Sequence, residues 1–192
     1  MAEARTNESQ RGDGAAQWIA AAFDALAEGG IGLVRVELLA RRLKLTKGSF
    51  YWHFADRPAL LAALAAEWRD GRTAAIREQA GPAELPAAAR LAHLLDLYLG
   101  GGNPKGLRIE LAMRDWARHD SNAAKAVASV DAARLEAVGG LFEALGLPER
   151  EARARAHLFY AFIFGRSLIV GGRPEDAALC RAILLGQNGK KI

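Results

Sequence analysis

The sequence predicts an all-α protein of about nine helices, in which a small N-terminal domain is joined by a long helix to a larger helical body. Two observations predict this. The 192 residues include 41 Ala and 26 Leu, against 17 Val, Ile and Thr together. Ala and Leu lose little freedom in a helix, whereas β-branched residues lose rotamers there, which disfavours a sheet-dominated fold. Apolar residues also recur every three or four positions between the Gly and Pro breaks, as in amphipathic helices.

Composition also excludes several classes of protein. Hydrophobic residues make up 51% and charged residues 25% of the chain, which excludes a disordered protein. No apolar run approaches the roughly 18 residues that a membrane-spanning helix needs. Residues 1–14 are polar and lack the apolar core of a secretory signal, so we expect a cytoplasmic protein. The single cysteine, Cys180, can form neither an internal disulfide nor a thiolate metal cluster.

The N-terminal region predicts a flexible arm over residues 1–14, followed by three short helices in residues 15–56. The first helix is expected over residues 15–28, because Gly29 and Gly30 then stop it. Its apolar stripe comprises Ile19, Ala22, Phe23 and Leu26. The second and third helices are expected over residues 36–43 and 47–54, with Thr46 as the N-cap of the third, its hydroxyl accepting from the amide near Ser49.

A long helix is expected over residues 57–79, within a connecting segment that we place at residues 57–80. Asp56 is its expected N-cap, and Pro58 lies in the first turn, where its missing N–H costs nothing. Leu60, Leu64 and Trp68 lie four apart on one side. At about 1.5 Å per residue the helix would span roughly 34 Å.

Residues 81–192 predict a C-terminal domain of five further helices. Four of them carry an apolar stripe or end at a Gly or Pro break. The segment from Leu158 to Val170 differs, because it is apolar nearly all round and is interrupted only at residues 165–167. A helix of that kind must be covered on both sides.

Positive charge is concentrated near the second and third helices. The net charge of the chain is +4, which is too small to argue from as a total. Residues 35–57 alone reach +4, since they hold six cations and only two acids, Glu37 and Asp56. The six cations are Arg35, Arg41, Arg42, Lys44, Lys47 and Arg57.

Residues 36–54 have the pattern helix, short turn, helix, in which a second helix enters the DNA major groove while the first crosses the backbone. The second helix combines a cation, small residues and hydrogen-bonding aromatics. Phe50 and Phe54, four apart, are expected to face the core. Tyr51, Trp52 and His53 are consecutive and cannot all point inward, so a purely structural role for these three is rejected.

Residues 38–61, LLARRLKLTKGSFYWHFADRPALL, resemble the helix-turn-helix of the TetR family of bacterial transcriptional regulators. The likeness extends over residues 15–68. The resemblance implies a homodimeric, sequence-specific repressor that a small-molecule effector releases from a palindromic operator in double-stranded DNA. The residues it implies for base reading or the groove edge are Lys47, Gly48, Ser49 and Trp52. Those it implies for phosphate contact are Thr46, Tyr51, His53 and Arg57.

Two positions depart from the family pattern. Arg35 stands where a Thr or Ser usually caps the second helix, so we expect a weaker cap, although Arg35 can itself contact phosphate. Lys44 occupies the turn position usually held by Gly, whose role there is to accept a positive φ. The turn is therefore either strained or differently shaped.

The resemblance places an effector pocket and a dimer interface in the C-terminal domain. The residues expected to line the pocket are Tyr98, Met113, Trp116, Asp131, Phe142 and Phe162. The residues expected at an interface between the last two helices of each copy are Ala161, Gly165, Arg166, Ala178, Ile183 and Leu184. Asp131 and Arg166 lie on apolar stripes, where each is either a ligand anchor or a structural ion-pair partner.

Two other classes of function compete with this interpretation. One is an all-helical enzyme or small-molecule carrier with an incidental basic patch. It would need a catalytic constellation, and the sequence shows none; the four histidines also lack metal-ligand spacing, so no metal or cofactor is expected. The other is a nucleoid or adaptor protein that binds DNA of any sequence.

Overall fold

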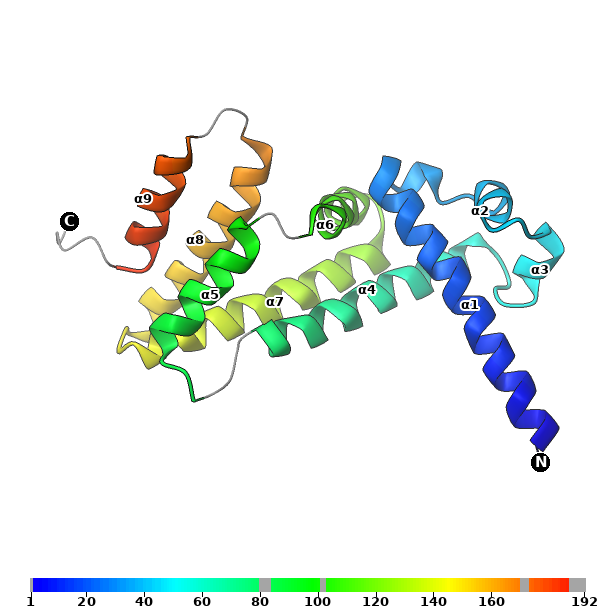
Figure 1. Ribbon diagram of the computed structural model, residues 1–192, viewed down its shortest axis with the longest axis horizontal. Helices are drawn as coiled ribbons and strands as arrows, with labels where there is room; N and C mark the ends of the chain where they lie inside the picture. The colour runs from blue at the N-terminus through cyan, green and yellow to red at the C-terminus, as the bar shows by residue number, and fades with distance from the viewer. Residues whose placement is uncertain (1, 80–83, 101–102, 170–172, 187–192) are drawn as a thin grey trace. The chain divides into compact units, whose positions relative to one another are not determined.

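The computed structural model describes residues 2–79, 84–100, 103–169 and 173–186, and throughout this part of the chain the regular structure is helical (Figure 1). The all-α class predicted from the sequence is therefore confirmed. The helices are α1 (Ala2–Gly29), α2 (Val36–Leu43), α3 (Lys47–Tyr51), α4 (Arg57–Gln79), α5 (Ala87–Leu99), α6 (Pro104–Ala117), α7 (Ser121–Ala144), α8 (Glu149–Leu168) and α9 (Pro174–Leu184), with a short 3-10 helix, η1 (Ile31–Leu33).

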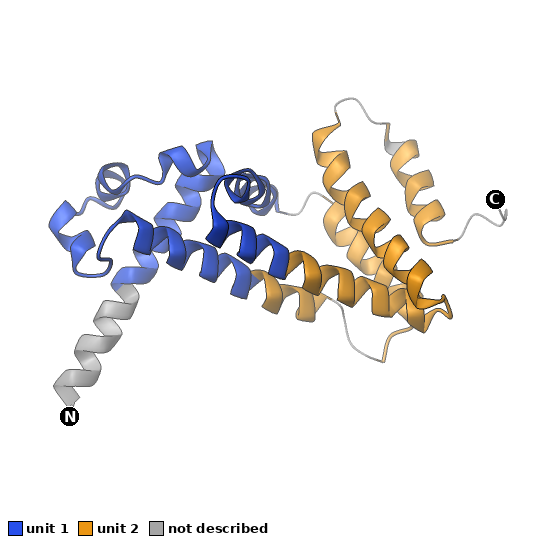
Figure 2. Cartoon of the chain, turned by 180° about the vertical axis from the view of Figure 1, so that it is seen from behind, with its two compact units in different colours: residues 1–71, 103–129 blue, residues 72–102, 130–192 orange. Residues whose placement is uncertain are grey.

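The chain forms two compact units (Figure 2). Unit 1 contains residues 1–71 and 103–129, and unit 2 contains residues 72–102 and 130–192. Helices α4 and α7 each contribute to both units. Residues 103–129, which the sequence analysis placed in the C-terminal domain, thus cluster with the helix-turn-helix in unit 1. The domain boundaries that the sequence predicts after residues 14, 56 and 80 stay a prediction.

Unit 1 is built around α1, which packs against η1, α2 and α6. Its buried face includes Trp18, which is 0% exposed, alongside Ala22 and Leu26. Trp18 was not part of the expected stripe, and two members of that stripe, Ile19 and Phe23, are only half-buried. Side chains from the other helices complete this core: Leu39, Phe50, Leu60 and Leu64.

Helix α1 is longer than expected. It begins at Ala2, whereas the sequence predicts a flexible arm over residues 1–14 and a helix only from residue 15. The physical reason is local composition, because residues 2–11 contain Ala, Glu, Arg and Gln and no proline. Gly12 and Gly14 weaken a helix without ending it.

The elements around the helix-turn-helix follow their capping residues closely. The bounds of α2 and α4 agree with those expected, and Asp56 caps α4 by accepting from the Ala59 N–H at 2.8 Å. Helix α3 ends at Tyr51, three residues earlier than expected. A final turn continues the chain, since the N–H groups of His53 and Phe54 both donate to the Phe50 carbonyl, at 2.9 and 3.0 Å.

Lys44 adopts the left-handed conformation that its place in the turn requires, with φ 55° and ψ 36°. It is the only residue other than glycine with a positive φ among those that the structure describes. The turn is closed by the N–H of Leu45, which donates to the Ala40 carbonyl at 2.9 Å. The turn therefore keeps the positive φ that a Gly would adopt at this position. The cost is steric, because the Lys44 Cβ comes close to the following carbonyl oxygen in this conformation.

Unit 2 has its own core, formed by α5, α8 and the part of α7 that belongs to it, and α9 also packs on α8. The fully or nearly fully buried residues of this core are Leu91, Leu94, Leu95, Val138, Leu141, Phe142, Ala152, Ala156, Phe159, Tyr160 and Ile163. Arg181 of α9 makes a bidentate ion pair with Asp96 of α5, at 3.0 and 3.1 Å.

Replacing Lys44 by Gly is expected to stabilise the protein by about 0.5–1 kcal/mol, because glycine adopts a positive φ without steric strain. The melting temperature should rise by about 2 °C. Lys44→Ala is the matched control, since it removes the side chain but keeps the Cβ, and it should give no gain. A Lys44→Gly protein no more stable than Lys44→Ala in thermal and urea unfolding would contradict a strained turn.

Candidate nucleic-acid interface

The start of α3 is fixed by local hydrogen bonds. The Thr46 hydroxyl oxygen accepts from the Ser49 N–H at 3.2 Å, as expected, and the Ser49 hydroxyl donates to the Thr46 carbonyl at 2.9 Å. The Thr46 hydroxyl proton is not used in this cap and can still be donated to a phosphate. Gly48 is exposed between them, with no side chain to hold a partner away.

Phe50 anchors α3 in unit 1. Its ring is fully buried, meets the Trp18 ring edge-on at 5.2 Å between centroids, and stacks on Phe54 at 5.5 Å. The inward orientation expected for both phenylalanines is confirmed. Because the chain turns about 100° per residue, burying Phe50 places the residues beside it outward.

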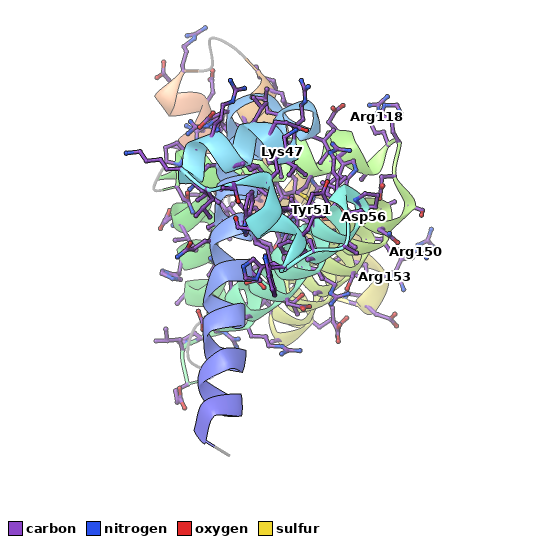
Figure 3. All side chains as sticks on the ribbon, turned by 90° about the vertical axis from the view of Figure 1, so that its right-hand side faces the viewer. Lys47, Tyr51, Asp56, Arg118, Arg150 and Arg153 are labelled. Atoms are coloured by element: carbon purple, nitrogen blue, oxygen red, sulfur yellow. The ribbon has the colours of Figure 1, made fainter. Side chains whose placement is uncertain are left out.

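The outward residues of α3 and its final turn are large aromatics and a cation. Tyr51 is 61% exposed and Trp52 is 74% exposed. The exposed Lys47 belongs to the same short helix as Tyr51, and Figure 3 looks onto the end of unit 1 that carries Lys47 and Tyr51. Exposed aromatic surface of this extent in water is typical of a binding site.

His53 is oriented differently from its neighbours. Its half-buried ring lies against α1 so closely that a Cβ added to Gly14 would be 2.4 Å from the ring. Gly14 therefore allows α1 and the end of the helix-turn-helix to approach each other. The structure gives His53 a packing role beside the phosphate contact expected of it.

Arg57 is engaged in a structural role. Its Nε donates to the Val34 carbonyl at 2.7 Å, and a terminal nitrogen donates to the Ile31 carbonyl at 3.1 Å. These bonds tie the start of α4 to the connection between α1 and α2. The side chain is half-buried and two of its nitrogens donate within the protein, which leaves less of it for the phosphate contact that the resemblance implies.

Ion pairs reduce the positive charge of residues 35–57. Arg42 forms a bidentate pair with Glu28 of α1, and Lys47 pairs with Glu37 of α2 at 2.8 Å. The Arg42 guanidinium holds the pKa of Glu28 below its ordinary value, and the Lys47 ammonium does the same for the pKa of Glu37. Three further cations, Arg35, Arg41 and Lys44, are exposed, and Arg35 makes no side-chain cap to α2, as expected.

The expected effector residues divide between the two units. Met113 and Trp116 are buried in unit 1, whereas the other four belong to unit 2: Tyr98, Asp131, Phe142 and Phe162. Phe142 is part of the unit 2 core, and Tyr98 and Phe162 pack against that core while half-buried. The structure therefore does not bring the six together in one unit.

The most unusual charged side chain of unit 2, Arg134, was not predicted from the sequence. Its side chain is 2% exposed, and its guanidinium carbon lies 5.3 Å from the centre of the Phe164 ring and 5.8 Å from that of Tyr160. One nitrogen is 3.5 Å from the Asp131 carboxylate, so Asp131 has a structural partner. Burial raises the pKa of the Tyr160 hydroxyl above its ordinary value. The sequence did contain one signal for this burial. Arg134 lies four residues from both Val130 and Val138, so it shares their apolar face of the helix.

A second buried charge lies in unit 1, where Glu110 of α6 is 3% exposed and pairs with Arg114 one turn later, at 2.9 Å. The same unit holds an ion pair between Lys105 of α6 and Asp24 of α1. Both pairs involve α6, the helix that packs against α1, and the second pair joins the two helices.

The residues expected at the dimer interface lie on a surface that is exposed in the single chain. Ala161, Arg166, Ala178 and Ile183 are exposed, whereas Gly165 and Leu184 are half-buried. Further large apolar residues of α8, α9 and the segment after α8 are 55–70% exposed: Leu158, Leu168, Ile169 and Leu179. Arg166 reaches the Leu99 carbonyl only at 3.5 Å.

Comparison with known proteins gives a consistent result. Residues 19–64 match the model of the tetR family of bacterial regulatory proteins. A transcriptional regulator from Rhodococcus sp. RHA1 has the same fold, with a TM-score of 0.73 and 20% identity over 90% of this chain and 94% of that one. A TetR regulator from Legionella pneumophila gives a TM-score of 0.72 at 14% identity, covering 89% and 95%. A putative TetR-family regulator from Rhodococcus sp. gives 0.62 at 26% identity, covering 92% and 96%.

No curated protein sequence gives a significant match. Within the described residues, no helix is long and apolar enough to cross a membrane. The same part of the chain contains no group of three or more His, Cys, Asp or Glu side chains that could hold a metal ion.

Proposed function

We propose that this chain, which belongs to the TetR family of bacterial transcriptional regulators, is a homodimeric repressor that leaves a palindromic operator when a small molecule binds. The family consists of DNA-binding regulators and not of enzymes, so the alternative of a helical enzyme with an incidental basic patch is set aside. Repression, dimerisation and release by an effector are the proposed parts.

The observation that carries the DNA-binding part of the proposal is the exposed face of α3. Phe50 is buried, and Lys47, Tyr51 and Trp52 project outward beside the small residues Gly48 and Ser49. A cation at the start of a short helix and hydrogen-bonding aromatics at its end suit the edges of bases and the flanking phosphates. In a dimer, two such helices about 34–36 Å apart would enter successive major grooves of one operator.

Changing Lys47 and Tyr51 together to Ala is expected to weaken operator binding about 10- to 100-fold, since each removes a donor from the interface. Binding is measured by mobility shift on the DNA upstream of the chain's own gene and on a scrambled duplex. Lys125→Ala, at an exposed position on α7, is the control and should bind as the wild type does. Equal wild-type affinity for both duplexes, with a steep salt dependence, would indicate instead a protein that binds any DNA.

The dimer part of the proposal is supported by the apolar surface of α8 and α9. Exposed Leu and Ile side chains on two neighbouring helices of unit 2 are uncovered in the single chain, and small residues such as Ala161 allow close approach of a second copy. Helices α8 and α9 of two copies would form a four-helix interface related by a two-fold axis.

Ile183→Glu is expected to produce a monomer at micromolar concentration, because the interface would then bury an unpaired carboxylate. Light scattering after size exclusion measures the mass. Leu97→Glu is the matched control, at a residue of α5 that is 42% exposed, and it should leave the dimer intact. A wild-type monomer, or an Ile183→Glu dimer as stable as the control, would refute this interface.

For the effector part of the proposal we place the site in unit 2, among α5, α7 and α8. There Tyr98 and Tyr160 meet edge-on at 6.2 Å, and the Arg134 guanidinium lies beside the stacked rings of Tyr160 and Phe164. Aromatic side chains favour an apolar effector, and an anionic group on that effector would compete with Asp131 for the Arg134 guanidinium.

A set of apolar carboxylates is expected to include a compound that raises the melting temperature and releases the operator, and Arg134→Met should abolish the rise. Arg134→Lys is the control because it keeps the charge. Each melting shift is measured against the same variant without compound, so that a loss of intrinsic stability is not mistaken for a loss of binding. A rise that Arg134→Met leaves unchanged would place the compound elsewhere.

A further inference from the structure

Glu37 lies at the DNA-reading end of unit 1 and has no place in the proposed contacts. It belongs to the first turn of α2, and its carboxylate oxygen is 2.8 Å from the Nζ of Lys47 in the first turn of α3. The two side chains are 51% and 58% exposed, so the pair is accessible to a large partner. The ion pair joins an acid of α2 to Lys47, the cation of α3 that is proposed to contact DNA.

Glu37 is one of only two acids in residues 35–57. The other, Asp56, already accepts the Ala59 N–H as the cap of α4. The Lys47 ammonium keeps the pKa of Glu37 below its ordinary value, so its carboxylate is charged at neutral pH. A negative charge therefore stands beside the reading cation, on a surface expected to approach polyanionic DNA.

We propose that Glu37 is a specificity-determining residue, which pairs with Lys47 and thereby lowers the affinity of α3 for DNA of arbitrary sequence. This inference rests on the proposed binding of DNA. The acceptors that DNA offers to Lys47 at every sequence position are phosphates, and to reach one the ammonium must leave Glu37. The carboxylate then remains unpaired near the phosphates, which repel it.

A matching base pair removes this penalty. Guanine presents the acceptors O6 and N7 in the major groove, and cytosine presents an N4 amino donor. Lys47 can donate to guanine while Glu37 accepts from cytosine, so the ion pair stays together and both groups gain a partner. We therefore expect a G·C pair in each operator half-site opposite the Glu37–Lys47 pair.

The test uses the full chain and a random duplex library. The wild type first selects its preferred sequence, and its affinities for that duplex and for a scrambled one are then compared over a range of salt concentrations. Glu37→Gln should bind the scrambled duplex roughly twofold to fivefold more tightly, a factor set by the strength of an exposed ion pair. Its salt slope on that duplex should steepen by about 0.9, corresponding to one added phosphate contact. The selected sequence should gain less, so the specificity ratio falls.

Two controls separate this mechanism from a general change in charge. Glu67→Gln makes the same charge change at an exposed position of α4, about 15 Å along the helix from Arg57, and should leave the ratio unchanged. In a Lys47→Met background, Glu37→Gln should no longer lower the ratio. Circular dichroism of each variant confirms that it is folded.

The outcomes distinguish this inference from the regulator proposal. If the wild type selects no sequence, both fail. If the wild type selects a sequence but Glu37→Gln behaves like Glu67→Gln, only the role of Glu37 is overturned. The role is also overturned if the Glu37→Gln effect persists without Lys47, or if the selected half-site tolerates any base pair opposite these residues.

Discussion

The exposed surface formed by Lys47, Tyr51 and Trp52 depends on one contact, the burial of Phe50 against Trp18. Helix α3 has only five residues, and a helix of that length has no stability of its own in water. It persists because Phe50 is fully buried against a residue of α1, while the Thr46 side chain caps its first turn. The exposed positions of Lys47, Tyr51 and Trp52 follow from that one buried ring. The orientation of α3 thus depends on α1, which is remote from it in sequence.

Besides the stacking of Phe54 on Phe50, a backbone conformation and two side-chain hydrogen bonds to backbone carbonyls hold the connections around α3. Lys44 adopts a left-handed conformation so that the chain can turn between α2 and α3. Arg57 holds the carbonyls of Ile31 and Val34, which precede α2, and so fixes the start of α4 relative to the other end of the motif. The Arg57 side chain also satisfies two backbone carbonyls. Two residues, Lys44 and Arg57, thus orient the motif at both of its ends.

The parts of the fold that were predictable from the sequence are those controlled by short-range effects. The bounds of α2 and α4 and the caps at Thr46 and Asp56 depend on residues at most three positions away. The role of Arg57 was not predictable, because its partners are backbone carbonyls 23 and 26 residues earlier, and any residue can supply a carbonyl. Arg134 was missed for a related reason: its burial depends on rings of α8 that lie far along the chain. Helical spacing indicated which residues face an apolar core and could line a pocket. It did not indicate that these residues are divided between two units.

The charge of the helix-turn-helix also has a different meaning in three dimensions. The sequence shows an excess of +4 over residues 35–57, and this alone suggests non-specific attraction to phosphate. In the structure, however, Arg42 is paired with α1, Lys47 is paired with α2, and Arg57 is directed to backbone carbonyls. Half of the six cations therefore have partners within the protein, each with defined geometry. A surface of this kind attracts DNA weakly through its total charge, so discrimination between sequences must come from where its donors and acceptors stand relative to the base edges.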